Sequence, residues 1–194
     1  MHDIARLQKE SYDQGGYFTA EQARMHGVSR QLLDHHVRGG RFERIRRGLY
    51  RVTGFPRGEH DEIREKWLAV GSDNAVVSHQ SALALHDLSD NIPNAVHVLV
   101  PRRLRGLRRP TGVVVHTTKD DAPIPIVWRE GIAVTPPARS IVDAADQLQP
   151  EQLEMAVRQA LERGLLTRRQ LEQESAARRV GHDAIDRVLA LIKP

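Results

Sequence analysis

The chain contains no cysteine among its 194 residues. This absence excludes disulfide bonds, thiol catalysis and cysteine-bound zinc, and it is typical of proteins from a reducing compartment. The first residues, MHDIARLQKE, lack the basic-then-apolar pattern of a signal peptide. No apolar run approaches the roughly 20 residues that span a bilayer. We therefore expect a cytoplasmic protein with no membrane segment.

The sequence also lacks the short motifs that carry common enzyme chemistry. It has no glycine-rich phosphate loop of a recognised spacing and no Ser/His/Asp set in a nucleophile-elbow context. His79 and His86 lie seven residues apart on one expected helix face, but no third metal ligand is indicated near them, so we interpret them as packing or surface residues. Asp143 and Asp146 could form a carboxylate pair, but we expect Asp143 to bond Arg139 or a backbone amide. We predict no catalytic residue, no metal site and no cofactor.

Charge is distributed unevenly along the chain. Residues 1–56 hold ten basic and six acidic residues, a net charge of +4, whereas residues 57–194 hold nineteen of each. A basic excess confined to one segment suits contact with nucleic-acid phosphates, although a solvated basic surface is the simpler alternative.

The basic segment has the pattern of a winged helix-turn-helix. Thr19 and Gln22 fit a capping box for a helix over 20–26, Gly27 can end that helix, and Ser29 can cap a second helix to about Arg38. The segment RFERIRRGLYRV follows, with β-forming residues on both sides of a turn at Arg46-Arg47-Gly48. The order predicts a recognition helix followed by an arginine-bearing wing.

The helix over 29–38 divides into two faces. Leu32, Leu33, His36 and Val37 form the packing face, and the polar face can meet base edges and phosphates in the major groove. With the wing, the residues predicted to contact DNA are Ser29, Arg30, Gln31, Asp34, His35, Arg38, Arg41, Arg44, Arg46, Arg47 and Arg51.

The rest of the chain predicts a second domain. Residues 53–58, TGFPRG, form a break, so we place the DNA-binding domain at 1–56 and the second domain at 57–194. Helices are expected over 59–70, 78–88, 138–147, 150–163, 168–177 and 183–192, and strands over 94–100, 112–117 and 125–134. The fold class is therefore α+β: a winged helix-turn-helix, then a small sheet and a helical C-terminal tail.

A second basic run, RRLRGLRR, lies between the first two of these strands. Its arginines are Arg102, Arg103, Arg105, Arg108 and Arg109. The run could bind nucleic acid, or it could be the solvated tip of a hairpin.

Three stretches of this chain resemble the AbiEi family, the antitoxins of bacterial type IV toxin–antitoxin and abortive-infection systems. They are GRFERIRRGLYRV, SHQSALALHDL at 78–88, and a tail that begins AVTPPARSIVD. Thr135, Pro136, Ala138, Arg139, Val142 and Asp143 form the most distinctive part of the tail. The resemblance implies a winged helix that binds DNA repeats upstream of its own operon and represses transcription. It also implies that the C-terminal domain counteracts a nucleotidyltransferase-like toxin, without a need for a stable complex.

Three alternatives compete with this interpretation. A winged-helix regulator could carry a ligand-sensing or dimerisation domain and have no antitoxin role. The second domain could be an enzyme with an unfamiliar active site that modifies the toxin. A related class continues into a restriction-like nuclease, but no lysine after residue 57 follows an acid at the acid-x-Lys spacing that such a magnesium site needs, so we set it aside.

Overall fold

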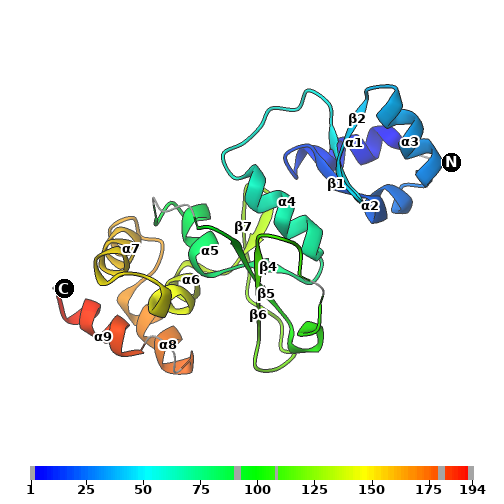
Figure 1. The fold of residues 1–194 in the computed structure, drawn as a ribbon. Coiled ribbons are helices and arrows are strands. Elements are labelled where there is room, and N and C mark those ends of the chain that lie inside the picture. The colour runs from blue at the N-terminus through cyan, green and yellow to red at the C-terminus, as the bar shows by residue number, and fades with distance from the viewer. Residues whose placement is uncertain (1–2, 90–92, 108, 179–181, 192–194) are drawn as a thin grey trace. The chain divides into compact units, whose positions relative to one another are not determined.

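The computed structural model describes residues 3–89, 93–107, 109–178 and 182–191 (Figure 1). The chain divides into two compact units: residues 1–73 with 130–132, and residues 74–129 with 133–194. The first unit thus includes the helix that follows the predicted boundary at residue 56. The division into domains at 1–56 and 57–194 stays a prediction.

The first unit has a helical part and a three-stranded sheet. Its elements are α1 (Ile4–Tyr12), β1 (Tyr17–Thr19), α2 (Ala20–Met25), α3 (Arg30–Arg38), β2 (Phe42–Arg46), β3 (Leu49–Val52) and α4 (Asp61–Val70). The strands are antiparallel in the order β1-β3-β2. Two short helices followed by a hairpin fit the predicted winged helix-turn-helix.

Local signals in the sequence account for these elements. The Thr19 hydroxyl accepts from the Gln22 backbone N–H and the Gln22 side chain accepts from the Thr19 N–H, which is the predicted capping box. Ser29 caps α3 by accepting from the Leu32 N–H. Gly48, at the turn of the β2–β3 hairpin, has φ of 81°, a conformation that favours glycine.

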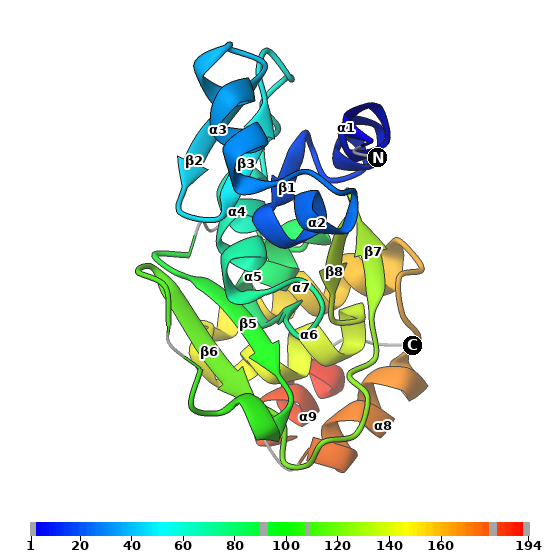
Figure 2. The same ribbon diagram turned by 90° about the vertical axis from the view of Figure 1, so that its right-hand side faces the viewer.

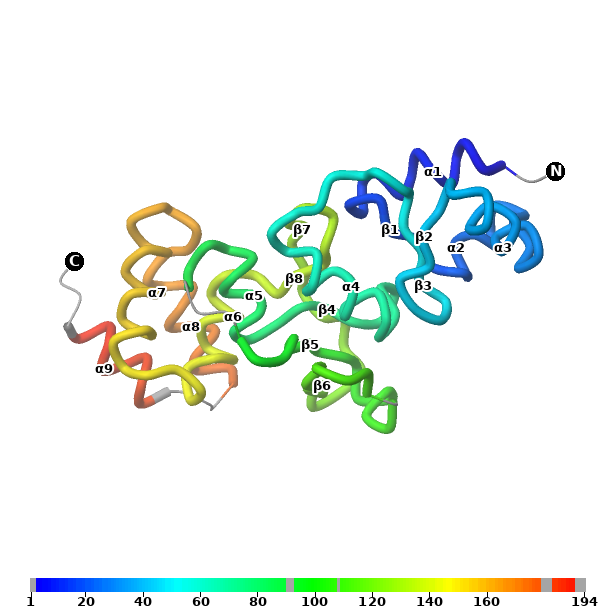
Figure 3. The backbone as a smooth tube through the Cα atoms, turned by 45° about the horizontal axis from the view of Figure 1, so that its top comes forward, coloured from blue at the N-terminus to red at the C-terminus, as the bar shows by residue number. Residues whose placement is uncertain are grey.

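The core of the first unit is aromatic. Phe18 meets Phe42 edge-on at 4.8 Å between ring centroids and stacks on Tyr50 at 5.6 Å. Leu7 of α1 and Leu33 of α3 are buried against the same cluster. Burial of these side chains fixes α3 against the sheet, and Figures 2 and 3 show α3 beside the β2–β3 hairpin.

The second unit combines a five-stranded sheet with a helical layer. Its elements are β4 (Val76–Val77), α5 (His79–Leu85), β5 (Val96–Val100), η1 (Arg102–Leu104), β6 (Val113–Thr117), β7 (Val127–Arg129), β8 (Ile132–Val134), α6 (Pro137–Ala144), η2 (Ala145–Gln147), α7 (Pro150–Glu162), α8 (Arg168–Arg178) and α9 (His182–Leu191). The strand order is β6-β5-β4-β8-β7. The observed helices and small sheets confirm the α+β class.

The sheet differs from the prediction in two places. The single strand expected over 125–134 is two strands, β7 and β8, because Glu130 and Gly131 both have positive φ, 49° and 74°, and reverse the chain. Gly131 also lies so close to Asp13 that an added Cβ would stand 1.8 Å from the Asp13 carbonyl oxygen. The short strand β4 was not predicted.

The pairing of β5 with β6 is parallel, with Val96 opposite Val113 and Val100 opposite Thr117. A parallel pair needs a crossover connection. The segment between these strands is therefore a crossover, and the alternative of a hairpin tip for RRLRGLRR was wrong.

The helices of the second unit share one apolar core. Leu83 of α5, Ile141 of α6, Val157 of α7, Leu171 of α8 and Ile185 of α9 are all fully buried in it. Figure 1 shows α6 to α9 gathered at one side of the sheet. Within the described ranges, no helix is long and apolar enough to cross a membrane.

Candidate functional site

Helix α3 presents the polar face that the sequence predicted. Ser29, Arg30, Gln31, His35 and Arg38 are exposed, and Asp34 is half-buried. On the opposite face Leu33 is buried, Leu32 and Val37 pack on the core, and the His36 ring meets Phe42 at 5.6 Å. The packing face therefore holds α3 with its polar face toward solvent.

The arginines of the wing and its flanks differ in exposure and in their partners. Arg44 and Arg47 are exposed, and within the described part of the chain their side chains make no hydrogen bond or ion pair. Arg41 is exposed and donates to the Gln8 side chain at 3.0 Å, and Arg46 is half-buried and donates to the Glu65 backbone carbonyl. Arg44 and Arg47 are thus the wing cations best placed to meet a phosphate.

Arg51 has a structural role instead. Its side chain is 3% exposed, donates to the Pro56 carbonyl at 2.8 Å, and lies 3.5 Å from the Asp61 carboxylate. The guanidinium also stands 5.1 Å from the centre of the Tyr17 ring. A side chain so enclosed is not available to DNA, so we exclude Arg51 from the proposed interface.

Asp61 is the centre of this buried group. Its carboxylate contacts Arg51, lies 3.9 Å from Arg64, and accepts from the Tyr17 hydroxyl at 3.2 Å. The Glu65 carboxylate lies closer to the same hydroxyl, at 2.7 Å, so the two acids share its single proton. Burial together with these two acids raises the pKa of Tyr17. Burial lowers the pKa of Arg64, although Asp61 and Glu130 oppose the change.

The second basic run is partly engaged by its own loop neighbours. Arg102 donates to the Lys119 carbonyl at 2.8 Å, and Arg103 lies near Asp121, at 3.8 Å. Arg105 and Arg109 are exposed, and Arg108 lies outside the described residues. A nucleic-acid role for this run stays a prediction.

Two of the family-like stretches meet inside the second unit. His86, at the end of α5, donates from Nε2 to the Thr135 carbonyl at 2.8 Å. The hydroxyls of Thr135 and Ser140 lie 2.7 Å apart, and Arg139 pairs with Asp143 at 3.3 Å, as predicted. SHQSALALHDL and TPPARSIVD therefore form one packed unit.

We predict that His86 makes the protein less stable in acid. Burial lowers its pKa, and Arg129 stands 3.4 Å from Nδ1, the atom that would gain the proton. Because the unfolded histidine binds its proton at a higher pH, near its ordinary pKa of about 6.5, the free energy of unfolding falls as pH drops below that value.

His86→Gln keeps a donor for Thr135 and does not titrate. Urea unfolding of both proteins at about pH 7 and pH 5 should show a smaller loss in the variant. An equal loss in the two proteins would contradict the assignment.

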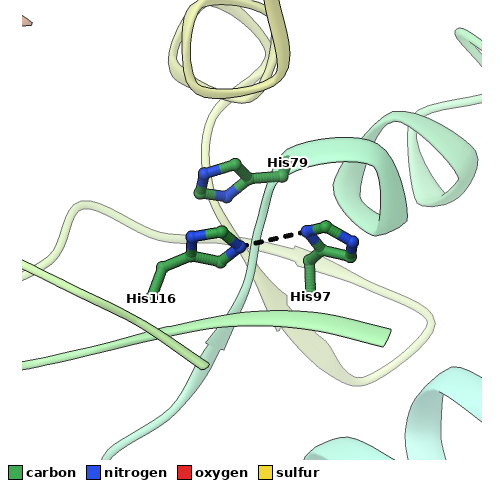
Figure 4. Close-up of side chains that lie close together, drawn as sticks. All are labelled: His79, His97 and His116. Atoms are coloured by element: carbon green, nitrogen blue, oxygen red, sulfur yellow. Dashed lines mark hydrogen bonds between the residues drawn. The ribbon is translucent and has the colours of Figure 1, made fainter. Parts of the chain in front are cut away.

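A histidine cluster lies elsewhere in the second unit (Figure 4). His97 Nδ1 and His116 Nε2 are 3.0 Å apart, and the His79 ring stacks on His116 with 3.6 Å between centroids. His79 and His116 also line a cavity of about 480 Å³, together with Arg139, Asp143 and Arg178. Asp143 lies between the two arginines, 3.3 Å from Arg139 and 3.5 Å from Arg178.

The sequence patterns did not predict this cluster. His79 was weighed with His86, its neighbour at helical spacing, whereas its actual companions come from β5 and β6. The signal was a single histidine in each of two apolar strands, VHVLV and VVVHT. The parallel register of β5 and β6 places His97 and His116 on the same face.

The first unit is similar to a known protein family. Residues 5–53 match the family model described as "Transcriptional regulator, AbiEi antitoxin". The AbiEi resemblance is confirmed for this segment of the chain. The match covers α1 to β3, the helix-turn-helix and its wing, and it supports a DNA-binding regulator of the antitoxin class.

Most of the chain is similar in fold to a solved protein. The crystal structure of the RV2827C protein from Mycobacterium tuberculosis aligns with a TM-score of 0.52 and 14% identity, over 95% of this chain and 75% of that chain. At this identity the likeness shows the fold alone. No curated protein matches the chain significantly.

Proposed function

We propose that the protein is a cytoplasmic antitoxin of a type IV toxin–antitoxin system that also represses its own operon. The first unit binds repeats in the promoter DNA, and the second unit counteracts a nucleotidyltransferase-like toxin without a need for a stable complex. The observation that carries the DNA-binding half is the exposed polar face of α3 beside two unpaired wing arginines, in a segment that matches AbiEi regulators.

The two parts of the interface have different tasks. Arg30 and Gln31 stand exposed at the first turn of α3, where a recognition helix contacts base edges. Arg44 and Arg47 carry charge on the hairpin beside the helix, where contact with phosphate positions the protein without reading sequence. Specificity is therefore assigned to α3, and salt-dependent affinity to the wing.

Replacing Gln31 or Arg30 by alanine should reduce discrimination between promoter and random DNA by about 1–3 kcal/mol per lost bidentate contact. Fluorescence anisotropy with labelled duplexes from upstream of the gene measures this difference at fixed salt. Met25→Ala is a suitable control, because Met25 is exposed at the end of α2, outside the proposed interface. Equal losses on both DNAs would show that α3 does not read bases.

The antitoxin half is tested by growth. The neighbouring reading frame, expressed from an independent promoter, should arrest growth, and co-expression of this protein should restore it. Arg44→Ala with Arg47→Ala should weaken repression of a promoter reporter and still restore growth, because both changes lie in the first unit. Failure of the wild-type protein to restore growth would contradict the antitoxin role.

A ligand-sensing regulator is the second candidate. The cavity of about 480 Å³ in the second unit, lined by paired charges and two histidines, is the observation that favours it. If the protein is a ligand-sensing regulator, it should still repress the promoter reporter, but its co-expression with the neighbouring reading frame should not restore growth. Enzymatic modification of the toxin is tested separately, as a mass change on the toxin after incubation of both proteins with nucleotides.

A further inference from the structure

Three histidines from three elements converge in the second unit. His79 begins α5, His97 lies in β5 and His116 lies in β6 (Figure 4). Each offers a ring nitrogen, and these three atoms all lie within 4.8 Å of one another. Among the described residues, these three histidines are the group whose ligand atoms have the spacing of a metal site.

The sheet register explains how the two strand histidines meet. His97 stands opposite Val114 on the parallel strand β6, so His116, two residues further along, points to the same face as His97. The face holds both imidazoles at half-buried positions, with 3.0 Å between the nearest nitrogens. A hydrogen bond between His97 and His116 places one proton between the lone pairs of these two nitrogens. A metal ion can bind both nitrogens in place of that proton.

The backbone brings the third histidine to this pair. His79 has φ of 53°, in the left-handed region that few residues other than glycine adopt. Non-glycine residues in this region cluster at functional sites. The Ser78 hydroxyl lies 3.0 Å from His79 Nδ1, which orients the ring and leaves Nε2 as the available ligand atom.

The three rings are in the state that metal ligands need. Burial and the neighbouring imidazoles lower the pKa of His79 to about 2 and that of His97 to about 4, and burial also lowers the pKa of His116. All three are therefore neutral at pH 7, and each ring has one nitrogen that carries no proton. The nearby Arg139 and Arg178 are paired with Asp143 and Glu174, so these four side chains carry no net charge that would repel a cation.

We propose that His79, His97 and His116 form a binding site for one divalent transition-metal ion of the zinc class. Imidazole nitrogen favours zinc, cobalt, nickel or copper, whereas magnesium and calcium prefer oxygen ligands. His79 and His116 also line the cavity that contains Asp143, so the remaining coordination position faces this cavity and is filled by water or an anionic group.

Metal binding must close the cluster slightly. Nitrogens in a tetrahedral zinc site lie about 3.3 Å apart, given zinc–nitrogen bonds of about 2.0–2.1 Å. The nitrogens of His97 and His116, at 3.0 Å, are already close to this spacing, so the larger movement falls on His79. Its ring tilts away from the stack on His116, toward the nitrogens of the other two.

Cobalt binding to the full chain tests the proposal. The untagged protein is dialysed against a chelator and then titrated with Co²⁺, whose visible absorption reports tetrahedral nitrogen ligands. One Co²⁺ per chain is expected, with displacement by Zn²⁺ and no displacement by Mg²⁺. An absence of Co²⁺ and Zn²⁺ binding by the wild-type protein would overturn the proposal.

Variants assign the ligands. His97→Gln and His116→Gln should each weaken Co²⁺ affinity by about 100-fold or more, since loss of supporting residues alone costs 10–100-fold. His35→Gln, which changes an exposed histidine of α3, is the matched control and should bind as the wild type does. Unchanged affinity in both cluster variants would place the metal elsewhere and overturn the proposal.

A separate measurement covers variants that fail to fold. Zn²⁺ should raise the thermal midpoint of the wild-type protein, because an ion that binds only the folded state stabilises it, and Mg²⁺ should not. In the wild-type protein Zn²⁺ should also protect His79, His97 and His116 from chemical modification by diethyl pyrocarbonate, detected by mass spectrometry, while His35 remains reactive. A cluster that reacts equally with and without Zn²⁺ would show that the three histidines form a metal-free stack.

Discussion

Replacing Asp61 by asparagine is expected to lower the free energy of unfolding of the first unit by about 3–5 kcal/mol. The substitution keeps the size of the side chain and removes its charge. Asp61 is 7% exposed and lies beside two buried cations, Arg51 at 3.5 Å and Arg64 at 3.9 Å. Without the carboxylate these guanidinium groups are buried beside each other with one opposing charge fewer, which is costly in a low-dielectric interior.

Tryptophan fluorescence measures this change. Trp67 is 2% exposed in α4 and Trp128 is 63% exposed in the second unit. With Trp128→Phe as the background, Trp67 is the only tryptophan and reports unfolding of the first unit. The control is Glu62→Gln, which removes an acid next to Asp61 that is 69% exposed and pairs with Lys66. This control should cost under about 1 kcal/mol, and an equally small loss for Asp61→Asn would contradict the role of the buried group.

Arg44→Ala with Arg47→Ala is expected to weaken promoter binding by about 30-fold at 0.15 M salt and to reduce the slope of log affinity against log salt by about 1.8. Each phosphate contact contributes about 0.9 to that slope through the release of condensed cations. The loss should be nearly equal for promoter and random DNA, because phosphates carry no sequence information.

The matched control removes the same charge from another surface of the first unit. Arg6 and Arg24 are exposed and lie near Glu10 at 3.2 Å and Glu21 at 3.7 Å. Arg6→Ala with Arg24→Ala should leave the salt slope close to that of the wild type. If both double variants lowered the slope equally, the effect would come from net charge and not from contacts at the wing.

The first unit was largely predictable because its signals are local. The capping box at Thr19, the cap at Ser29 and the turn at Gly48 each act within a few residues, so the helices and the hairpin follow from neighbouring side chains. The alternation of packing and polar faces along α3 was visible for the same reason. The sequence did not distinguish the buried Arg51 from the exposed wing arginines, because the burial of Arg51 depends on Asp61, ten residues further along the chain.

The second unit was predicted less well because its arrangement depends on distant pairing. The helices of the tail were recognised from their apolar periodicity, but β4 has two residues and gives no periodic signal. Parallel pairing of β5 with β6 leaves no local signature in either strand. The histidine cluster depends on that register, so a search at helical spacing paired His79 with His86 instead.

The discontinuity of the first unit has a consequence for protein synthesis. Arg64 donates to the Glu130 carbonyl at 2.6 Å, and Gly131 lies against Asp13, so residues 130–132 complete a unit that otherwise ends at residue 73. A ribosome translating this message releases the DNA-binding helices early and the segment that completes their unit only much later. The regulator therefore finishes assembling its DNA-binding unit only after most of the sheet of the second unit has been translated.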